Sequence, residues 1–202
     1  MSKILPPVCQ HCGMGLAGAY DANVVCQRCQ RRTLSFEKAR APLVYIGVVR
    51  EAIHEFKYRG RRRIGRWLAE HMARTAAHEL PVSKIETVLP VPMHWLKLRL
   101  KGANPVAVLA QAVAKSIGTS CDLGSLRRTR WTPTQTRLDL PQRFRNVQGA
   151  FRVRRHRISD RTVLLVDDVL TSGATTHACA LALKEAGAKA VFVLTAACAP
   201  PS

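Results

Sequence analysis

The chain has 202 residues, which fits one substantial domain with a small appendage. It carries 32 Lys and Arg against 13 Asp and Glu, a net charge of +19, while 47% of its residues are hydrophobic. The hydrophobic share excludes a disordered chain, and the basic excess favours a polyanionic partner: nucleic acid, anionic lipid or a small phosphorylated ligand.

The sequence shows no signal for a membrane or a secretory route. No apolar run approaches the roughly 20 residues of a transmembrane helix, and the N-terminus lacks the apolar stretch of a secretory signal. The number of cysteines, seven, is odd, which argues against a framework of disulfides. We therefore expect a cytoplasmic protein without a transmembrane segment.

Four of the cysteines form two C-x-x-C pairs near the N-terminus, with thirteen residues between the pairs. Each pair lets two thiolates converge on one cation, and two pairs complete a tetrahedral sulfur shell that suits Zn²⁺. The alternative is a set of free or redox-active thiols. We predict a zinc-binding module over residues 1–41 and a second domain over 42–202, with these metal ligands: Cys9, Cys12, Cys26 and Cys29.

Apolar strands alternate with helical periods along the rest of the chain, which predicts an α/β fold with a central parallel sheet flanked by helices. Residues 127–157 show no clear period, and we predict a long, flexible basic loop around 127–146 followed by a short strand around Phe151. The predicted elements are strands over 43–49, 85–90, 162–166 and 190–196, and helices over 52–58, 65–80, 106–117 and 175–186.

The most informative stretch is residues 163–176, Val-Leu-Leu-Val-Asp-Asp-Val-Leu-Thr-Ser-Gly-Ala-Thr-Thr. Two carboxylates, Asp167 and Asp168, follow a buried strand, and carboxylates suit ribose hydroxyls or the shell of a Mg²⁺ ion. A hydroxyl-rich turn with a glycine then opens a helix, whose N–H groups suit a phosphate. The residues of this turn are Thr171, Ser172, Gly173, Ala174 and Thr175.

This stretch has three alternative interpretations. A receiver domain needs a phosphorylatable Asp well downstream, but only 34 residues follow Asp168 and none is Asp. A P-loop is absent, because the motif G-x-x-x-x-G-K-[ST] does not occur. A plain helix N-terminus with surface acids stays open as the alternative.

The 163–176 stretch resembles the phosphoribosyl pyrophosphate (PRPP) motif of type I phosphoribosyltransferases. Together with the cysteine pairs and the basic segments, it resembles the ComF family of competence-associated proteins over essentially the whole chain. The resemblance implies a type I phosphoribosyltransferase fold behind a zinc module. It also implies PRPP with Mg²⁺, held by Asp167 and Asp168 at the ribose and by residues 171–175 at the 5′-phosphate.

By the same resemblance, the loop after the 85–90 strand cradles pyrophosphate. The family's usual Arg-Gly-Phe-Asn-Gln appears here as Lys-Gly-Ala-Asn-Pro over 101–105. The change from Arg to Lys loses the bidentate fork of the guanidinium, so a phosphate contact there has a different shape. The residues implied at the pyrophosphate are Val91, Pro92, Met93, His94 and Lys101.

Two functions follow from this resemblance. The first is a phosphoribosyltransferase that displaces pyrophosphate from PRPP, although the sequence identifies no acceptor. The second is a module of the competence machinery that binds single-stranded DNA and keeps a non-catalytic PRPP site. The family's link to DNA uptake and natural transformation implies competence-machinery proteins as partners, which would bring the protein to the inner face of the membrane.

The DNA hypothesis rests on eleven arginines between positions 127 and 161, which lie beside aromatic residues. Cations neutralise phosphates and aromatic rings stack on bases, a combination that suits single strands. The competing interpretation is a solvated lid or an electrostatic funnel for PRPP. The predicted nucleic-acid-binding residues are Arg127, Arg128, Arg130, Trp131, Arg143 and Arg145.

Overall fold

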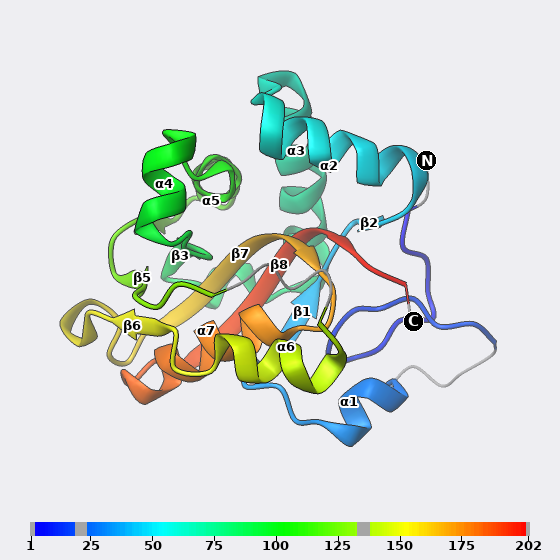
Figure 1. Cartoon of the computed structure of the whole chain (residues 1–202). Helices are drawn as coiled ribbons and strands as arrows, with labels where there is room; N and C mark the ends of the chain where they lie inside the picture. The colour runs from blue at the N-terminus through cyan, green and yellow to red at the C-terminus, as the bar shows by residue number, and fades with distance from the viewer. Residues whose placement is uncertain (1–2, 19–23, 133–137, 201–202) are drawn as a thin grey trace.

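The computed structural model describes residues 3–18, 24–132 and 138–200. A sheet with the strand order β1-β8-β7-β3-β4 lies at its centre, and β2 also pairs with β8 (Figure 1). All of these strand pairs are parallel, which confirms the predicted α/β fold with a central parallel sheet. The strands are β1 (Lys38–Arg40), β2 (Leu43–Val44), β3 (Thr87–Pro90), β4 (Ser120–Cys121), β7 (Thr162–Leu170) and β8 (Ala190–Cys198).

Helices cover both faces of the sheet, as the side chains of β7 require. Val163 and Leu165 lie in one apolar cluster and Leu164 and Val166 in the other, because successive side chains of a strand point to opposite faces. The first cluster is completed by α6 (Leu140–Val147) and α7 (Ala174–Glu185). The second is completed by α2 (Gly47–Arg59), α3 (Arg62–Glu79) and α5 (Pro105–Ile117) (Figure 1).

The cysteine segment packs onto the same face as α7. Cys9, Cys12 and Leu34 share an apolar cluster with residues of β7 and β8. Strand β1 joins the sheet beside β8, and the short helix α1 (Gln27–Arg31) begins at the second cysteine pair. The division of the chain at residue 41 stays a prediction.

The predicted strand over 43–49 is wrong beyond residue 44. Strand β2 pairs with the last residues of β8, and Val44 lies opposite Cys198, where β8 ends. The backbone finds no further strand to pair with there, and helix α2 begins at Gly47 with Ile46 as its N-cap. None of the helices in the described ranges combines the length and the hydropathy that a membrane span needs.

The region predicted as a long basic loop holds regular structure within its described part. The short strand around Phe151 is confirmed as β6 (Phe151–Val153), which pairs antiparallel with β5 (Leu126–Arg128). Helix α6 replaces the predicted loop over 140–147, because Asp139 and Gln142 form a capping box in which each side chain accepts from the other residue's backbone N–H. Helix α4 (Trp95–Lys101) was also not predicted.

Candidate functional site

A cavity of about 280 Å³ lies where β3 and β7 reach the carboxyl edge of the sheet. Both predicted carboxylates, one residue of the predicted phosphate turn and three residues of the loop after β3 line it. Two lysines and an arginine line it as well, so the cavity combines two acids with three cations. These lining residues are Asp167, Asp168, Thr175, Val91, Pro92, Met93, Lys57, Lys97 and Arg128.

Lys57 of α2 forms an ion pair with Asp168, with 2.7 Å between Nζ and Oδ2. Burial alone would lower the pKa of Lys57, but the charges of Asp168 and Asp167 outweigh it and raise that pKa above its ordinary value. Lys57 therefore stays protonated and neutralises one of the two acids. The ion pair fixes the Asp168 carboxylate, whose side chain is only 13% exposed.

Asp167 has no such partner among the described residues, and its Oδ1 accepts the backbone N–H of Asp168 at 2.9 Å. Burial and the neighbouring Asp168 charge raise the pKa of Asp167 to about 7, against the opposing charges of Lys57 and Arg128. The pair therefore carries between one and two negative charges near neutral pH. Its oxygens can both accept from and donate to hydroxyl groups.

The predicted phosphate turn joins β7 to α7. Gly173 is the N-cap of α7 with a φ of +79°, a conformation that glycine adopts without strain. The Ser172 hydroxyl accepts from the backbone N–H of Ala174 at 3.3 Å, and Ser172 is buried. Of the turn's residues, Thr175 lines the cavity. The roles assigned to Thr171, Ser172, Gly173 and Ala174 stay predictions.

Arg28 of α1 connects this turn to the cysteine cluster. Its Nη1 donates to the carbonyl of Thr171, and its Nη2 lies 3.6 Å from the Sγ of Cys12. Leu34 supports the turn from the same side, because its Cδ1 lies 3.3 Å from the place that a Cβ on Gly173 would take. The cysteine segment therefore buttresses the predicted phosphate turn through two separate contacts.

The four predicted metal ligands converge on one point. Their sulfur atoms all lie within 4.8 Å of one another, and those of Cys12 and Cys26 are 3.7 Å apart. Tetrahedral zinc–thiolate bonds of about 2.3 Å place two sulfurs about 3.8 Å apart, so the cluster fits a metal ion such as zinc. Backbone N–H groups of Cys12 and Cys26 donate to the Sγ of Cys9. The neighbouring thiols of Cys12 and Cys29, and to a smaller extent these N–H groups, lower the pKa of Cys9.

The loop after β3 is held by Asn104, which persists together with Gly102 in the altered 101–105 segment. Its Nδ2 donates to the carbonyl of Val91 at 3.1 Å, while its Oδ1 caps α5 by accepting from Val106. His94 is buried, with 5% of the residue exposed. It is the N-cap of α4, and its Nδ1 accepts the backbone N–H of Leu96. His94 does not line the cavity, and the side chain of Lys101 lies outside the described part; both pyrophosphate roles stay predictions.

The chain is similar over nearly its whole length to proteins named for DNA use and competence. It is 28% identical over 193 residues to the DNA utilization protein YhgH of Escherichia coli K12, covering 92% of this chain and 82% of that protein. It is 28% identical over 192 residues to competence protein F of Haemophilus influenzae, covering 93% and 82%. It is 23% identical over 194 residues to competence protein ComFC of Bacillus subtilis, covering 93% and 75%. The predicted resemblance to the ComF family is confirmed.

No family model matches the chain. Solved structures similar to this ComF-like chain include the glutamine PRPP amidotransferase of B. subtilis complexed with ADP and GMP. The TM-score is 0.46 at 20% identity, and the match covers 70% of this chain but 30% of that one. The protein TT1426 from Thermus thermophilus has a TM-score of 0.38 at 17% identity, covering 64% and 71%.

The residues predicted to bind nucleic acid make different contacts, and their predicted role stays a prediction. Arg128 lines the cavity at the carboxyl edge of the sheet, and its buried Nε has no hydrogen-bond partner among the described residues. Arg127, Arg130 and Arg143 donate to backbone carbonyls within the ComF-like chain's own loop region. The ring of Trp131 lies 5.2 Å from that of His94, centroid to centroid, and Lys97 lies 5.2 Å above it.

Two residues of the site were given no role from the sequence. Lys57 lies 110 positions before Asp167; it falls at a position that the ComF resemblance marks, but its pairing with Asp168 comes from the fold. Arg28 was one basic residue among several near the cysteines. Its position inside the second C-x-x-C pair was a usable signal, because that pair brings it beside the metal centre.

Proposed function

We propose that the chain binds PRPP, together with Mg²⁺, in the cavity at the carboxyl edge of the sheet. The observation that carries this proposal is the convergence of Asp167, Asp168 and Thr175 with the loop over 91–93 on one cavity. An α/β sheet binds ligands at this edge, and the lining residues match the three parts of PRPP: the neutral ribose hydroxyls, the 5′-phosphate and the pyrophosphate. The resemblance of the 163–176 stretch to the PRPP motif supports the same ligand.

Each part of the ligand has its own group of residues under this proposal. The ribose hydroxyls bond to Asp167 and Asp168, and the 5′-phosphate accepts from the N–H and hydroxyl groups of residues 171–175. The pyrophosphate lies against the loop over 91–94, with Lys101 beside it. Lys57, Lys97 and Arg128 line the same cavity and add cations where charge develops on a departing pyrophosphate.

Two metals belong to the proposal in different roles. Zn²⁺ is bound by Cys9, Cys12, Cys26 and Cys29 and supplies structural cross-linking rather than chemistry, because four thiolates leave no open coordination position. Mg²⁺ accompanies PRPP and shields the charge of its phosphates. Among the described residues that line the cavity, the acids are Asp167 and Asp168, and oxygen ligands of this kind suit Mg²⁺.

The biological role we propose is DNA uptake during natural transformation, with phosphoribosyl transfer as the reaction. Transfer breaks the bond between the anomeric carbon and pyrophosphate, which leaves with the bonding electrons, while an acceptor forms the new bond. The names of the relatives support a competence role and competence-machinery partners. We place the protein in the cytoplasm, brought to the inner face of the membrane by those partners.

Isothermal titration with PRPP and Mg²⁺ tests the binding proposal. We expect saturable heat from the wild type and a loss of affinity of at least tenfold in Asp167→Asn/Asp168→Asn, because the ribose hydroxyls lose their charged acceptors. A matched control is Glu51→Gln/Glu70→Gln, which removes two exposed carboxylates elsewhere and should leave the affinity unchanged. No heat from the folded, metal-loaded wild type would contradict the proposal.

A further inference from the structure

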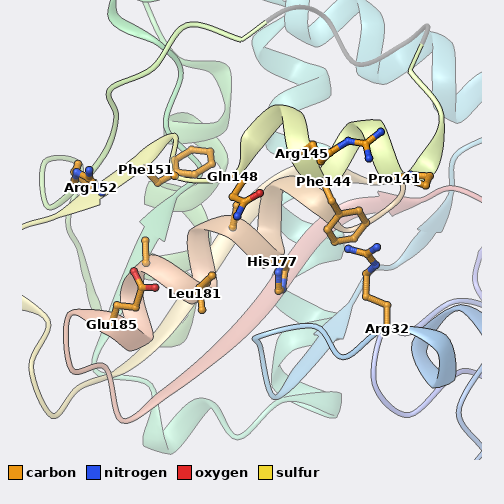
Figure 2. Close-up of a pocket in the computed structure, with 13 residues that line it drawn as sticks. Arg32, Pro141, Phe144, Arg145, Gln148, Phe151, Arg152, His177, Leu181 and Glu185 are labelled. Carbon is orange, nitrogen blue, oxygen red and sulfur yellow. The ribbon is translucent and has the colours of Figure 1, made fainter.

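A second cavity, of about 560 Å³, lies between α6 and α7 and shares no lining residue with the cavity proposed for PRPP. Figure 2 shows side chains from α6, α7, β6 and the segment after α1 around it. Its walls are apolar in part, with Phe144, Phe151 and Leu181 among the lining residues. This volume is sufficient for a ligand the size of one nucleotide.

The rim of this cavity is strongly basic. Arg32, Arg145 and Arg152 line it, and Glu185 is the one acid among its described lining residues. Arg145 and Arg152 are exposed and have no ion-pair or hydrogen-bond partner within the described ranges. Three cations therefore line the cavity, with Arg32 and Arg145 at one end and Arg152 at the other (Figure 2).

Arg32 offers a flat surface for a planar group. Its guanidinium carbon lies over the Phe144 ring, 4.1 Å from the ring centroid, so the aromatic ring supports the guanidinium from one side (Figure 2). A guanidinium held in this way presents its other face for stacking with a nucleobase. The arrangement restricts Arg32 before any ligand arrives, which reduces the entropy lost on binding.

His177 and Gln148 add neutral hydrogen-bonding groups to the cavity lining. The Nδ1 of His177 accepts the backbone N–H of Ser35 at 3.1 Å, so the neutral ring carries its proton on Nε2. Burial, and secondarily the charge of Arg32, lowers the pKa of His177, which keeps the ring neutral at pH 7. Three cations, a stacking plane and neutral donors together match a phosphate joined to a base.

We propose that this cavity binds a nucleotide, with its phosphate at Arg145, its base against Arg32, and the next phosphate of a strand at Arg152. The nucleotide is either free or one unit of a single strand, and both sources present the same chemistry. The cavity is therefore a candidate site for single-stranded DNA. This proposal does not depend on the proposal that the chain binds PRPP. Failure of one proposal leaves the other standing, because the two cavities share no lining residue.

Fluorescence anisotropy with a labelled dT20 strand, and competition by dTMP and AMP, test this proposal. We expect Arg145→Ala/Arg152→Ala to weaken dT20 binding at least tenfold. The slope of log K against log salt should fall by about 1.4, since each phosphate contact on a single strand contributes about 0.7. Leu181→Trp should also weaken binding at least fivefold without changing the charge, because the larger side chain fills the cavity.

The control Arg62→Ala/Arg63→Ala removes two exposed arginines from the first turn of α3, at the same cost in net charge. This control should bind dT20 with wild-type affinity. The control and the cavity variants should all bind PRPP as the wild type does. If dTMP or AMP displaces dT20, the ligand is a free nucleotide. If only unlabelled strands displace it and the mononucleotides do not, the ligand is a nucleotide within a single strand. Equal losses in the control, or unchanged binding in Leu181→Trp, would overturn the proposal, as would equally tight binding of polyglutamate.

Discussion

The charge state of the candidate site is decided by three side chains, Lys57, Asp167 and Asp168. The ion pair with Lys57 holds the Asp168 carboxylate in place, while burial and the neighbouring Asp168 raise the pKa of Asp167 to about 7. Adjacent residues of one strand point to opposite sides, so the two carboxylates do not have equivalent surroundings. The site therefore contains one carboxylate paired with a lysine and a second acid whose charge changes near neutral pH.

This difference predicts how stability depends on pH. The native pKa of Asp167, about 7, lies above its ordinary 3.8. The contribution of Asp167 to the free energy of unfolding is therefore fully present below pH 4, where the group is protonated in both states. That contribution is lost as the pH rises through 7. We expect Asp167→Asn to raise the melting temperature at pH 8 by about 2–4 °C, the shift that about 1 kcal/mol produces in a chain of this size. At pH 4 the variant and the wild type should melt together.

Differential scanning calorimetry at pH 4, 6 and 8 checks this prediction. Asp122→Asn is unsuitable as a control because Ser125 and Gly124 lower the pKa of Asp122 by hydrogen bonds. Glu70→Gln, on the exposed side of α3, is the better control and should leave the profile unchanged. If the melting temperature of the wild type rose from pH 4 to pH 8 relative to that of Asp167→Asn, the raised pKa of Asp167 would be contradicted.

At the scale of the elements, short segments position the site and long ones form its frame. Helix α7 and strand β7 carry the motif, but α1, only five residues long, holds the turn between them through Arg28. Because Arg28 also contacts Cys12, the geometry of the phosphate turn depends on the cysteine cluster. A module without catalytic residues can therefore influence ligand affinity.

Arg28→Lys tests this dependence. Lysine keeps the positive charge but cannot reach the Thr171 carbonyl and the Cys12 sulfur with one planar fork. We expect metal content to stay at the wild-type level while PRPP affinity falls about tenfold, or about 1.4 kcal/mol. Elemental analysis and calorimetric titration measure the two quantities. Arg31→Lys, an exposed change in the same helix, should alter neither, and a loss of affinity there would contradict the argument.

The sequence predicted the long elements and the motif more successfully than the short elements. Strands β3, β7 and β8 were recognisable because they are buried on both faces and therefore apolar without interruption. Helix α6 was missed because a basic segment of eight residues has too few periods to show, although the spacing of Asp139 and Gln142 was a local signal. Strand β2 was predicted too long because apolar residues over 45–49 suit a helix as well as a strand.

The candidate site was predicted in part for a physical reason. Groups carried by one continuous stretch, such as Asp167 and Asp168, are placed by local geometry and can be read from the sequence. Lys57 and Arg28 reach the site across the fold, and their contacts span more than 100 positions. Such contacts depend on packing of distant elements, which a local pattern does not encode.

At the scale of the whole molecule, the positive charge is distributed between two separate openings and the remaining surface. Three cations line the cavity proposed for PRPP, and three arginines line the second cavity. The cysteine cluster is part of the apolar core on the face that carries the second cavity, with Cys9 and Cys12 almost fully buried. The metal centre should therefore contribute to the stability of the whole chain.

Metal removal tests that expectation. We expect a chelator to lower the melting temperature by roughly 10 °C or more, which corresponds to about 3 kcal/mol of binding energy coupled to folding. The transition should stay single, because the cysteine segment and the sheet share one core. Calorimetry with and without restored Zn²⁺ measures the effect, and a chelated chain that melts like the untreated one would contradict a structural metal.

The most direct test of the central claim is a crystal structure of the metal-loaded chain grown with PRPP and Mg²⁺. The account predicts ribose hydroxyls on Asp167 and Asp168, the 5′-phosphate on the turn over 171–175, and pyrophosphate against the loop over 91–94. PRPP bound instead in the cavity walled by Arg32, Arg145 and Arg152, or ordered crystals at saturating PRPP with this edge of the sheet free of ligand, would contradict it.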